Sequence, residues 1–321
     1  MNGIAVLGSI LVDHINDIRK YPSAGELTKI ISIKDATGGC VPNVAIDLKR
    51  LSPSLRVIAG GKVGCDADGK FAVDTLAAEG VETSAVRVGD GRTSFTEVMS
   101  EIGGQRTFFT HPGASDDFGF DDVDFDLLDV RMLHLGYYLL LKKVDEGDGE
   151  RILAEAKARG IKTSIDLVSE NSDRYSMIIP SLKYTDNLII NEIEAGKLAG
   201  IEPTGDNLVK IGEKLLSYGV SERVIIHMKD LGIVVSRNGV TAMPSFELPR
   251  GFIKGTTGAG DAFCSGALLA IYEGRSDKEI LEYASISALG ALSAPDAVSG
   301  MATVEELEKL TYGLERKEIC L

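Results

Sequence analysis

Residues 256–263 read TTGAGDAF and are followed, after residues 264–266, by the apolar stretch ALLAI at residues 267–271. Two glycines before an apolar helical pattern predict a tight turn at the N-terminus of a helix. Backbone N–H groups in the first turn of a helix have no partner within the helix, and the helix dipole adds positive potential there. The turn formed by Gly258, Ala259 and Gly260 is therefore predicted to bind a phosphate or another anionic charge.

Asp261 follows this turn and lies in the first turn of the predicted helix. A carboxylate at that place is common, because it interacts favourably with the helix dipole. Beside an anion-binding turn, the same carboxylate could instead deprotonate an attacking hydroxyl while the turn stabilises the transferred group. The residues of this stretch alone leave both roles open.

Earlier in the chain, short β-branched runs alternate with longer amphipathic segments. The runs are almost entirely apolar and are bounded by polar or glycine residues, which is typical of strands buried on both faces. This alternation predicts a mainly parallel central sheet with helices on both faces, a three-layer α/β/α fold. The expected strands are 4–7, 56–59, 161–165, 187–190 and 223–226, and the expected helices are 44–51, 149–159 and 208–218.

Two segments interrupt this alternation. Residues 9–36 have no long helical pattern, and residues 93–110 alternate like strands around a Gly-Gly pair at 103–104, which fits a hairpin. We interpret both segments as a small β-sheet that projects from a single domain spanning residues 1–321. One interpretation is a lid over a site, formed by parts of residues 9–36 and 93–113. The other is an ordinary extension of the sheet.

The composition excludes several classes of function. A formal net charge of −14 argues against a nucleic-acid partner, which requires a basic surface. No apolar run approaches the roughly 18 residues of a membrane-spanning helix, and Asp13 comes too early for a signal peptide. Cys40, Cys65, Cys264 and Cys320 lack metal-binding spacing, so we interpret them as reduced thiols of a cytoplasmic protein.

The glycine-rich stretch resembles the C-terminal signature of the ribokinase-like (PfkB) family of carbohydrate kinases. That signature is roughly Asp-Thr-x-Gly-Ala-Gly-Asp, and residues 255–261 read GTTGAGD here. The resemblance implies that Asp261 is the catalytic base and that Gly258, Ala259 and Gly260 form the anion hole. It also implies ATP and Mg²⁺, a small sugar or sugar-like substrate phosphorylated on a primary hydroxyl, and a β lid that pairs in a homodimer.

The N-terminal half carries a second element of the same family. Residues 37–45 read TGGCVPNVA and resemble Gly-Gly-x-x-x-Asn-x-Ala, which implies that Gly38, Gly39 and Asn43 contact the sugar. Asn43 also stands where an N-cap would open the next helix, and capping alone would explain it. Asp13 resembles the family's substrate-binding carboxylate, and the ends of strands are where open α/β sheets bind ligands.

Two further elements point to the nucleotide. Asn191 and Glu194 stand in the sequence NEIE, which resembles the family's Asn-x-x-Glu. The resemblance implies that they position phosphate and Mg²⁺, Glu194 acting on the metal through water, although Glu194 could also be a solvated helix residue. The family's nucleotide loop, Thr-x-Gly-x-x-Gly, stands as HMKDLG at residues 227–232, where only Gly232 matches. Lys229 could approach the ATP phosphates or be a solvated loop residue.

The chain also departs from the family's pattern. Gly255 replaces an aspartate that helps to hold a monovalent cation in some members, and Cys40 replaces the lysine of ribose-specific members. These differences argue against potassium activation and against ribose. A nucleoside kinase of the same family is an alternative, which Phe109 or Tyr137 would favour by stacking in the acceptor pocket. A non-catalytic sugar or nucleotide sensor is another, although a sensor has no need for Asp261.

Overall fold

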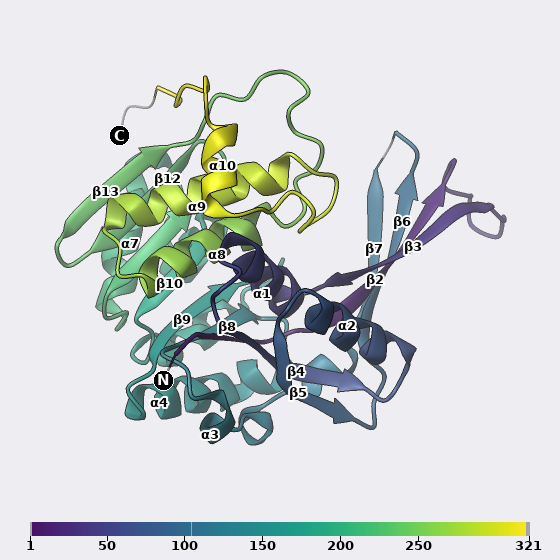
Figure 1. Ribbon diagram of the computed structural model, residues 1–321, viewed down its shortest axis with the longest axis horizontal. Helices are drawn as coiled ribbons and strands as arrows, with labels where there is room; N and C mark the ends of the chain where they lie inside the picture. The colour runs from purple at the N-terminus through teal and green to yellow at the C-terminus, as the bar shows by residue number, and fades with distance from the viewer. Residues whose placement is uncertain (1, 104, 319–321) are drawn as a thin grey trace.

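The computed structural model describes residues 2–103 and 105–318. Its larger sheet has nine strands in the order β13-β12-β11-β10-β9-β8-β1-β4-β5, and Figure 1 shows helices on both sides of it. Neighbouring strands are parallel except for the pairs β11–β12 and β12–β13, so the predicted mainly parallel sheet is confirmed. The strands are β1 (Ile4–Leu7), β4 (Val57–Gly64), β5 (Glu82–Gly89), β8 (Met132–Tyr138), β9 (Lys162–Leu167), β10 (Asn187–Asn191), β11 (Arg223–His227), β12 (Leu231–Ser236) and β13 (Gly239–Pro244).

Each face of this sheet is covered by its own hydrophobic core. Alternate strand residues enter opposite cores, as Ile4 and Val6 do on one side and Ala5 and Leu7 on the other. The predicted three-layer α/β/α fold is therefore confirmed. The first core contains α1 (Cys40–Leu51), α2 (Ala67–Ala78), α8 (Ala259–Tyr272), α9 (Asp277–Leu292) and α10 (Val304–Leu310), and the second contains α3 (Phe125–Leu128), α4 (Gly149–Ala158), α5 (Ile179–Leu182), α6 (Glu192–Ala199) and α7 (Leu208–Ser217).

The expected strands and helices all form; the strand at residues 4–7 keeps its ends, and the others have shifted ends. The main difference is at α1, which begins at Cys40 rather than near Val44. Gly39 is its N-cap, with φ of 89°, a conformation that glycine adopts without strain. Pro42 lies in the first turn, where a missing N–H is tolerated. The prediction that Asn43 caps this helix is therefore wrong. Within the described chain, no helix combines the length and apolar character needed to cross a membrane.

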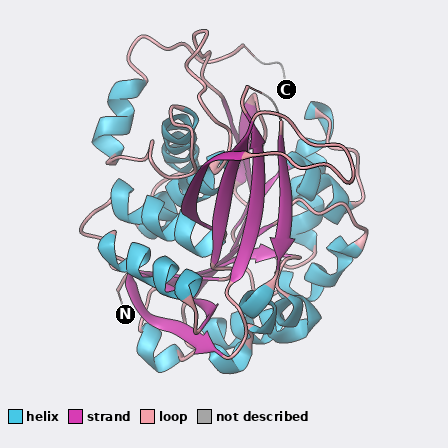
Figure 2. Cartoon of the chain, turned by 90° about the vertical axis from the view of Figure 1, so that its right-hand side faces the viewer, coloured by secondary structure: helices cyan, strands magenta, loops and turns pink. Residues whose placement is uncertain are grey.

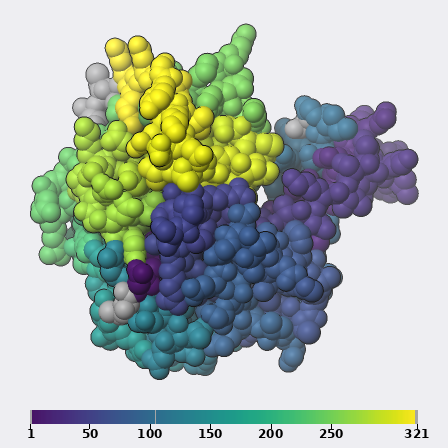
Figure 3. All heavy atoms as spheres, viewed as in Figure 1, coloured from purple at the N-terminus to yellow at the C-terminus, as the bar shows by residue number. Residues whose placement is uncertain are grey.

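The interrupting segments form a second, four-stranded sheet. Its order is β3-β2-β6-β7, with β2 and β6 parallel and the two outer pairs antiparallel. Figure 2 views this sheet face-on, and Figure 3 shows it projecting from the main body. Residue 104 of the expected Gly-Gly pair lies outside the described residues. The strands are β2 (Leu11–Ile18), β3 (Ile30–Gly38), β6 (Ser94–Glu101) and β7 (Arg106–His111).

The register of the small sheet brings distant polar residues together. Asp13 of β2 pairs with Thr96 of β6, which in turn pairs with Thr110 of β7. Residues that pair across neighbouring strands point to the same face, so these three side chains form a row. Strand β3 ends at Gly38 and leads through Gly39 directly into α1. The base of the small sheet is therefore continuous with the end of the main sheet where α1 begins.

Candidate active site

The glycine-rich turn forms the start of α8 as the sequence predicts. Gly258 is the N-cap, with φ of 79°, and a Cβ atom placed on it would lie 2.6 Å from the Cα of Ala297. Both constraints favour glycine. Farther along α8, a Cβ on Gly266 would collide with the Tyr283 carbonyl of α9, so these helices pack closely. The turn is thus held from two sides, and its helix N-terminus provides positive potential.

Asp261 lies in the first turn of α8 and is only 7% exposed. Its Oδ2 accepts hydrogen bonds from Asn43 Nδ2 at 2.8 Å and from the Tyr137 hydroxyl at 3.0 Å. Burial raises the pKa of Asp261 to about 7, and the nearby Asp166 adds to the shift, while the two hydrogen bonds oppose it. A carboxyl group with this pKa can accept a proton near neutral pH.

A cavity of about 240 Å³ opens between the small sheet and α8. All the residues that the sequence predicts for the acceptor line it, together with the predicted base. Its charged lining residues are the carboxylates Asp13 and Asp261, and none of the lining residues in the described chain is basic. The lining consists of Leu11, Asp13, Thr37, Gly38, Gly39, Asn43, Thr96, Phe108, Thr110, Tyr137, Thr257, Gly258, Asp261 and Ala297.

Gly38 and Gly39 of this cavity are required by close approach. A Cβ atom on Gly38 would lie 2.7 Å from Asp13 Oδ2, and one on Gly39 would lie 2.7 Å from the Ser9 carbonyl oxygen. Because neither glycine has a Cβ atom, the Asp13 carboxylate can face the cavity beside bare backbone. Burial raises the pKa of Asp13 to about 6, although His14 and a hydrogen bond with Thr96 oppose the shift.

A second cavity of about 210 Å³ lies on the other side of Asp261. Asn191 and Glu194 line it and form a reciprocal capping box at the start of α6. Glu194 also accepts a hydrogen bond from the Ser169 hydroxyl at 2.7 Å and is buried, so it is not a solvated helix residue. Burial raises the pKa of Glu194 to about 7. Capping and facing this cavity are compatible roles for both side chains.

The largest of the three cavities, about 510 Å³, extends from the turn toward α9. Lys229 and Gly232 line it, Lys229 as an exposed residue at its edge. A Cβ on Gly232 would lie 3.1 Å from Leu281 Cδ2, so glycine also suits local packing there. Most of the other walls are apolar, among them Phe263, Leu289 and Leu292. This cavity has the volume and the character of a site for a drug-sized ligand with a planar ring.

The glycine-rich turn joins the three cavities. We call the cavity beside Asp13 the acceptor-side cavity and the one beside Glu194 the central cavity. Gly258 and Asp261 line both of these, while Gly260 lines the central cavity and the largest one. A group passed from the largest cavity to the acceptor-side cavity would therefore cross the helix N-terminus beside Asp261. This arrangement suits transfer of an anionic group.

Some features of the site do not follow from the predicted residues. Asp166 lines the central cavity and accepts a hydrogen bond from the Tyr137 backbone N–H at 2.5 Å. Tyr137 has φ of 58°, a strained conformation outside glycine. Asp166 comes directly after the expected strand 161–165, so the strand-end argument that selects Asp13 would also select it. Phe108, not Phe109, lines the acceptor-side cavity, because neighbouring strand residues face opposite ways.

Two groups of side chains could hold a cation. The carboxylate oxygens of Asp166 and Glu194 and the amide of Asn191 line the central cavity, and oxygen ligands suit Mg²⁺. Deeper in the fold, ligand atoms of Cys40, His134 and Asp166 lie within 4.8 Å of one another, a set better suited to a softer ion. The Cys40 and Cys264 thiols are free and buried.

Comparison with known proteins agrees with this arrangement. The model of the pfkB family of carbohydrate kinases matches residues 1–303. A ribokinase of Arabidopsis thaliana is 25% identical over 312 residues, covering 96% of this chain and 80% of the relative. A 5-dehydro-2-deoxygluconokinase of Clostridium perfringens is 25% identical over 328 residues, covering 97% of this chain and 94% of that one.

Solved structures show the same fold. Arabidopsis thaliana ribokinase, complexed with ribose and ATP, superposes with a TM-score of 0.83 at 22% identity, covering 96% of this chain and 98% of that one. A nucleoside kinase of Methanocaldococcus jannaschii superposes with a TM-score of 0.76 at 17% identity, covering 96% and 97%. At these identities the structures support the fold and do not decide the acceptor.

Burial of Asp261 predicts a pH-dependent effect on stability. Its folded pKa of about 7 lies above its usual 3.8, so between these values the folded protein binds a proton that the unfolded chain releases. Stability is therefore lost as pH rises through 7. Asp261→Asn should raise the free energy of unfolding above about pH 7.5 by roughly 1–3 kcal/mol, and less near pH 5.

Urea unfolding at both pH values measures this difference. Asp173→Asn, at an exposed aspartate, is the control and should change stability equally little at both. The same pH dependence in Asp261→Asn and in the unmodified protein would contradict the shifted pKa.

Proposed function

The chain belongs to the pfkB family of carbohydrate kinases, and on that premise we propose that it transfers the γ-phosphoryl group of ATP to a primary hydroxyl of a small neutral sugar or polyol. Asp261 is the proposed general base. The observation that carries this assignment is its position, buried at the helix N-terminus that joins the acceptor-side and central cavities. ATP is also the nucleotide bound in the Arabidopsis thaliana ribokinase structure.

The acceptor binds in the acceptor-side cavity under the small sheet. Asp13 accepts hydrogen bonds from sugar hydroxyls, and Gly38, Gly39 and Asn43 complete the polar wall. The primary hydroxyl lies beside Asp261 and gives its proton to that carboxylate as its oxygen bonds to the γ-phosphorus. The bond from the γ-phosphorus to the β–γ bridging oxygen breaks, and ADP leaves.

The nucleotide binds in the largest cavity with its phosphates toward the turn. Backbone N–H groups of Gly258, Ala259 and Gly260 stabilise negative charge on the transferred group. Lys229 adds positive charge at the edge, and Gly232 lets the nucleotide approach the backbone. The apolar walls accept the base of the nucleotide. These roles are supported by the lining residues and by the way the cavities join.

Mg²⁺ fits the oxygen atoms of the central cavity. Asn191 and Glu194 would hold it together with Asp166, Glu194 acting through water. The ion supplies neutralisation of phosphate charge when it is bound. Burial raises the pKa of Glu194 to about 7, and a nearby positive charge would lower it.

The charges of the acceptor-side cavity favour a neutral acceptor. Asp13 and Asp261 are both carboxylates, and the described lining residues include no lysine or arginine. A sugar acid or sugar phosphate would bring a further negative charge into this partly buried site without a partner, which is costly. Hydroxyl groups can instead donate to both carboxylates.

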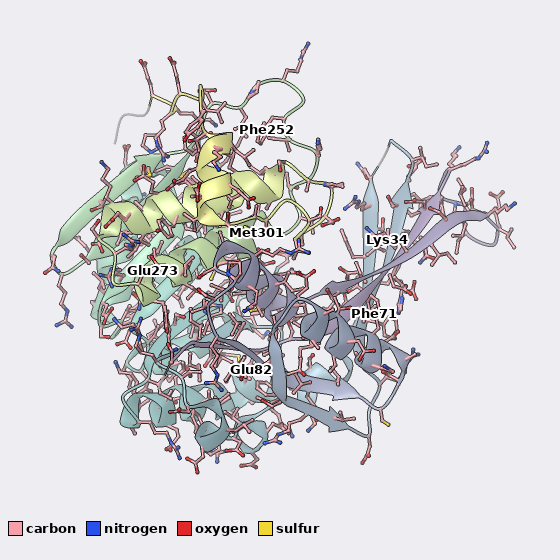
Figure 4. All side chains as sticks on the ribbon, in the orientation of Figure 1. Lys34, Phe71, Glu82, Phe252, Glu273 and Met301 are labelled. Atoms are coloured by element: carbon pink, nitrogen blue, oxygen red, sulfur yellow. The ribbon has the colours of Figure 1, made fainter. Side chains whose placement is uncertain are left out.

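The small sheet acts as a lid in this proposal. It carries Asp13, Thr96 and Thr110 on the face toward the acceptor, so its closure would exclude water from the reaction. Figure 4 shows Lys34 on this sheet, where its Nζ lies 3.9 Å from Asp296 Oδ2 in the main body. The lid and the main sheet with its helices belong to one domain.

The free thiols of Cys40, Cys65 and Cys264 support a reducing compartment such as the cytoplasm, and Cys320 lies outside the described residues.

An ADP-release assay with Mg-ATP tests the proposed reaction. The acceptors are neutral pentoses, hexoses and polyols, the matching sugar acids, and nucleosides. We expect ADP release with a neutral sugar or polyol, and kcat that falls as pH drops below about 7, because Asp261 must be ionised to accept a proton. Asp261→Asn should lower kcat by roughly 10²- to 10⁴-fold with little change in the KM for ATP.

Each other outcome has a defined meaning. Preference for sugar acids would contradict the neutral acceptor, and preference for nucleosides would select the nucleoside-kinase alternative, to which Phe108 would contribute by stacking. Bound ATP without acceptor-dependent turnover would favour the sensor. Unchanged kcat in Asp261→Asn would rule out the assigned base.

Gly39→Ala tests whether the acceptor binds in the acceptor-side cavity. The new Cβ combines strain at positive φ with contact with the Ser9 carbonyl, and the displaced backbone belongs to the acceptor-side cavity. We expect the KM for the acceptor to rise roughly tenfold or more, before the KM for ATP changes. Gly91→Ala is the control, because Gly91 is exposed and has no atom within 4 Å of the new Cβ. A larger effect on the KM for ATP than on the KM for the acceptor would contradict this assignment of the cavity.

We also propose a homodimer through the lid. Ile33 and Phe109 are 68% and 60% exposed and lie on the same face of the small sheet, opposite to Asp13. Ile33→Asp combined with Phe109→Asp should convert a dimer to a monomer in sedimentation equilibrium. Val240→Asp, at an exposed residue of β13, should leave it intact. A monomeric unmodified protein would refute the dimer.

A further inference from the structure

A carboxyl group that the proposed reaction does not use lies inside the fold near the base. Asp47 belongs to α1 and is fully buried, with 0% exposure. Neither of its side-chain oxygens has a hydrogen-bond partner in the described chain. Buried polar groups are rarely left unpaired, and a buried unpaired carboxylate is especially unfavourable. Asp47 therefore requires a specific explanation.

A second buried acceptor is unpaired one helical turn away. Asn43 uses Nδ2 to donate to Asp261, but its Oδ1 has no partner among the described residues and is shielded from solvent. Asn43 and Asp47 are separated by four residues on α1, so their side chains lie on the same face. Helical side chains also lean toward the helix N-terminus, which directs the Asp47 carboxyl toward Asn43.

The two unpaired groups complement each other if Asp47 is protonated. An ionised carboxylate only accepts hydrogen bonds, as Asn43 Oδ1 does, whereas a neutral carboxylic acid has one O–H to donate. Burial raises the pKa of Asp47 well above its usual value, and the charge of Asp261 raises it further, while Arg50 opposes the shift. Protonation thus removes an unfavourable charge and supplies the donor that Asn43 Oδ1 lacks.

We propose that Asp47, as a neutral acid, donates a hydrogen bond to Asn43 Oδ1 and so holds the Asn43 amide with its Nδ2 toward Asp261. Asp47 is then a positioning residue for the base, an inference that rests on the proposed function of Asp261. The three side chains form a line from the interior of α1 to the first turn of α8, and these two helices pack against each other.

This arrangement fixes the one orientation of Asn43 that serves the base. If the amide turned over, its Oδ1 would face Asp261 Oδ2, and two acceptors would be in contact. If Asp47 were ionised, it could pair only with the NH₂ group of Asn43, and Asn43 Oδ1 would be left without a donor. A neutral Asp47 prevents both, because its O–H can pair only with the amide oxygen.

Substitutions that separate the donor from the side-chain volume test the proposal. Asp47→Asn keeps a donor in nearly the same shape, whereas Asp47→Leu fills the space without one. We expect Asp47→Leu to lower kcat roughly tenfold, the effect of one lost hydrogen bond to a buried group, with the KM for ATP unchanged. Asp47→Asn should restore kcat to within about threefold of the unmodified enzyme.

A purely structural role would affect folding in both variants without separating their kcat values. The unchanged KM for ATP shows that Asp47→Leu is folded, and Asp47→Ala provides a second donor-free variant if leucine does not fit. Equal kcat in the unmodified enzyme and a folded donor-free variant would overturn the positioning role.

Protonation of Asp47 is measured independently of catalysis. The infrared difference between the unmodified protein and Asp47→Asn at neutral pH should contain the C=O stretching band of a protonated carboxyl. The same band should appear when both proteins carry Asp261→Asn. Its absence would overturn the neutral acid, whereas unchanged kcat in Asp261→Asn alone would overturn only the base assignment and leave the band as evidence on Asp47.

Discussion

Placing a carboxylate in a nearly dry position at a helix N-terminus is the constraint on which the rest of this molecule depends. Asp261 is buried, so its charged form is disfavoured, yet its place in α8 sets it beside positive helix potential. Two hydrogen-bond donors from distant segments, Asn43 and Tyr137, make ionisation near neutral pH attainable. The three-layer fold is needed because these donors come from α1 and β8, which meet α8 only when the sheet is complete.

Glycines allow these segments to approach one another closely. Gly258 lets the turn pass close to Ala297, and Gly38 and Gly39 bring bare backbone up to Asp13 and Ser9. The same turn then lies between three cavities, so one short segment connects the cavity proposed for the acceptor with the cavity proposed for the nucleotide. Catalysis of group transfer depends mainly on such positioning and on electrostatic stabilisation.

Much of this structure could be predicted from the sequence, because buried parallel strands and glycine-rich helix starts have local signatures. The run at residues 4–7 is observed as β1 without change, and Asp261 lies in the first turn as expected. The N-cap of α1 could not be assigned in this way, because Gly39 competes with Asn43 for that position and backbone geometry decides. The strained Tyr137 and the unpaired Asp47 depend on contacts between segments far apart in the chain, which a local pattern does not encode, whereas Asp166 stands at the end of an expected strand, where the sequence already points to it.

Gly136 shows how one contact between distant segments limits which residues a position can accept during evolution. Its backbone has an ordinary conformation, yet a Cβ atom there would overlap the sulfur of Cys40. The need for glycine at residue 136 is thus imposed by a neighbour that is 96 residues earlier in the chain. Positions 40 and 136 are expected to evolve as a correlated pair: the Cβ of residue 40 would itself lie 2.9 Å from a Cβ at 136, so alanine at 136 is expected with glycine at 40, and glycine at 136 with a larger residue at 40. Across related proteins, variation at residue 40, the first residue of α1, would then be accompanied by variation on β8, a strand inside the main sheet.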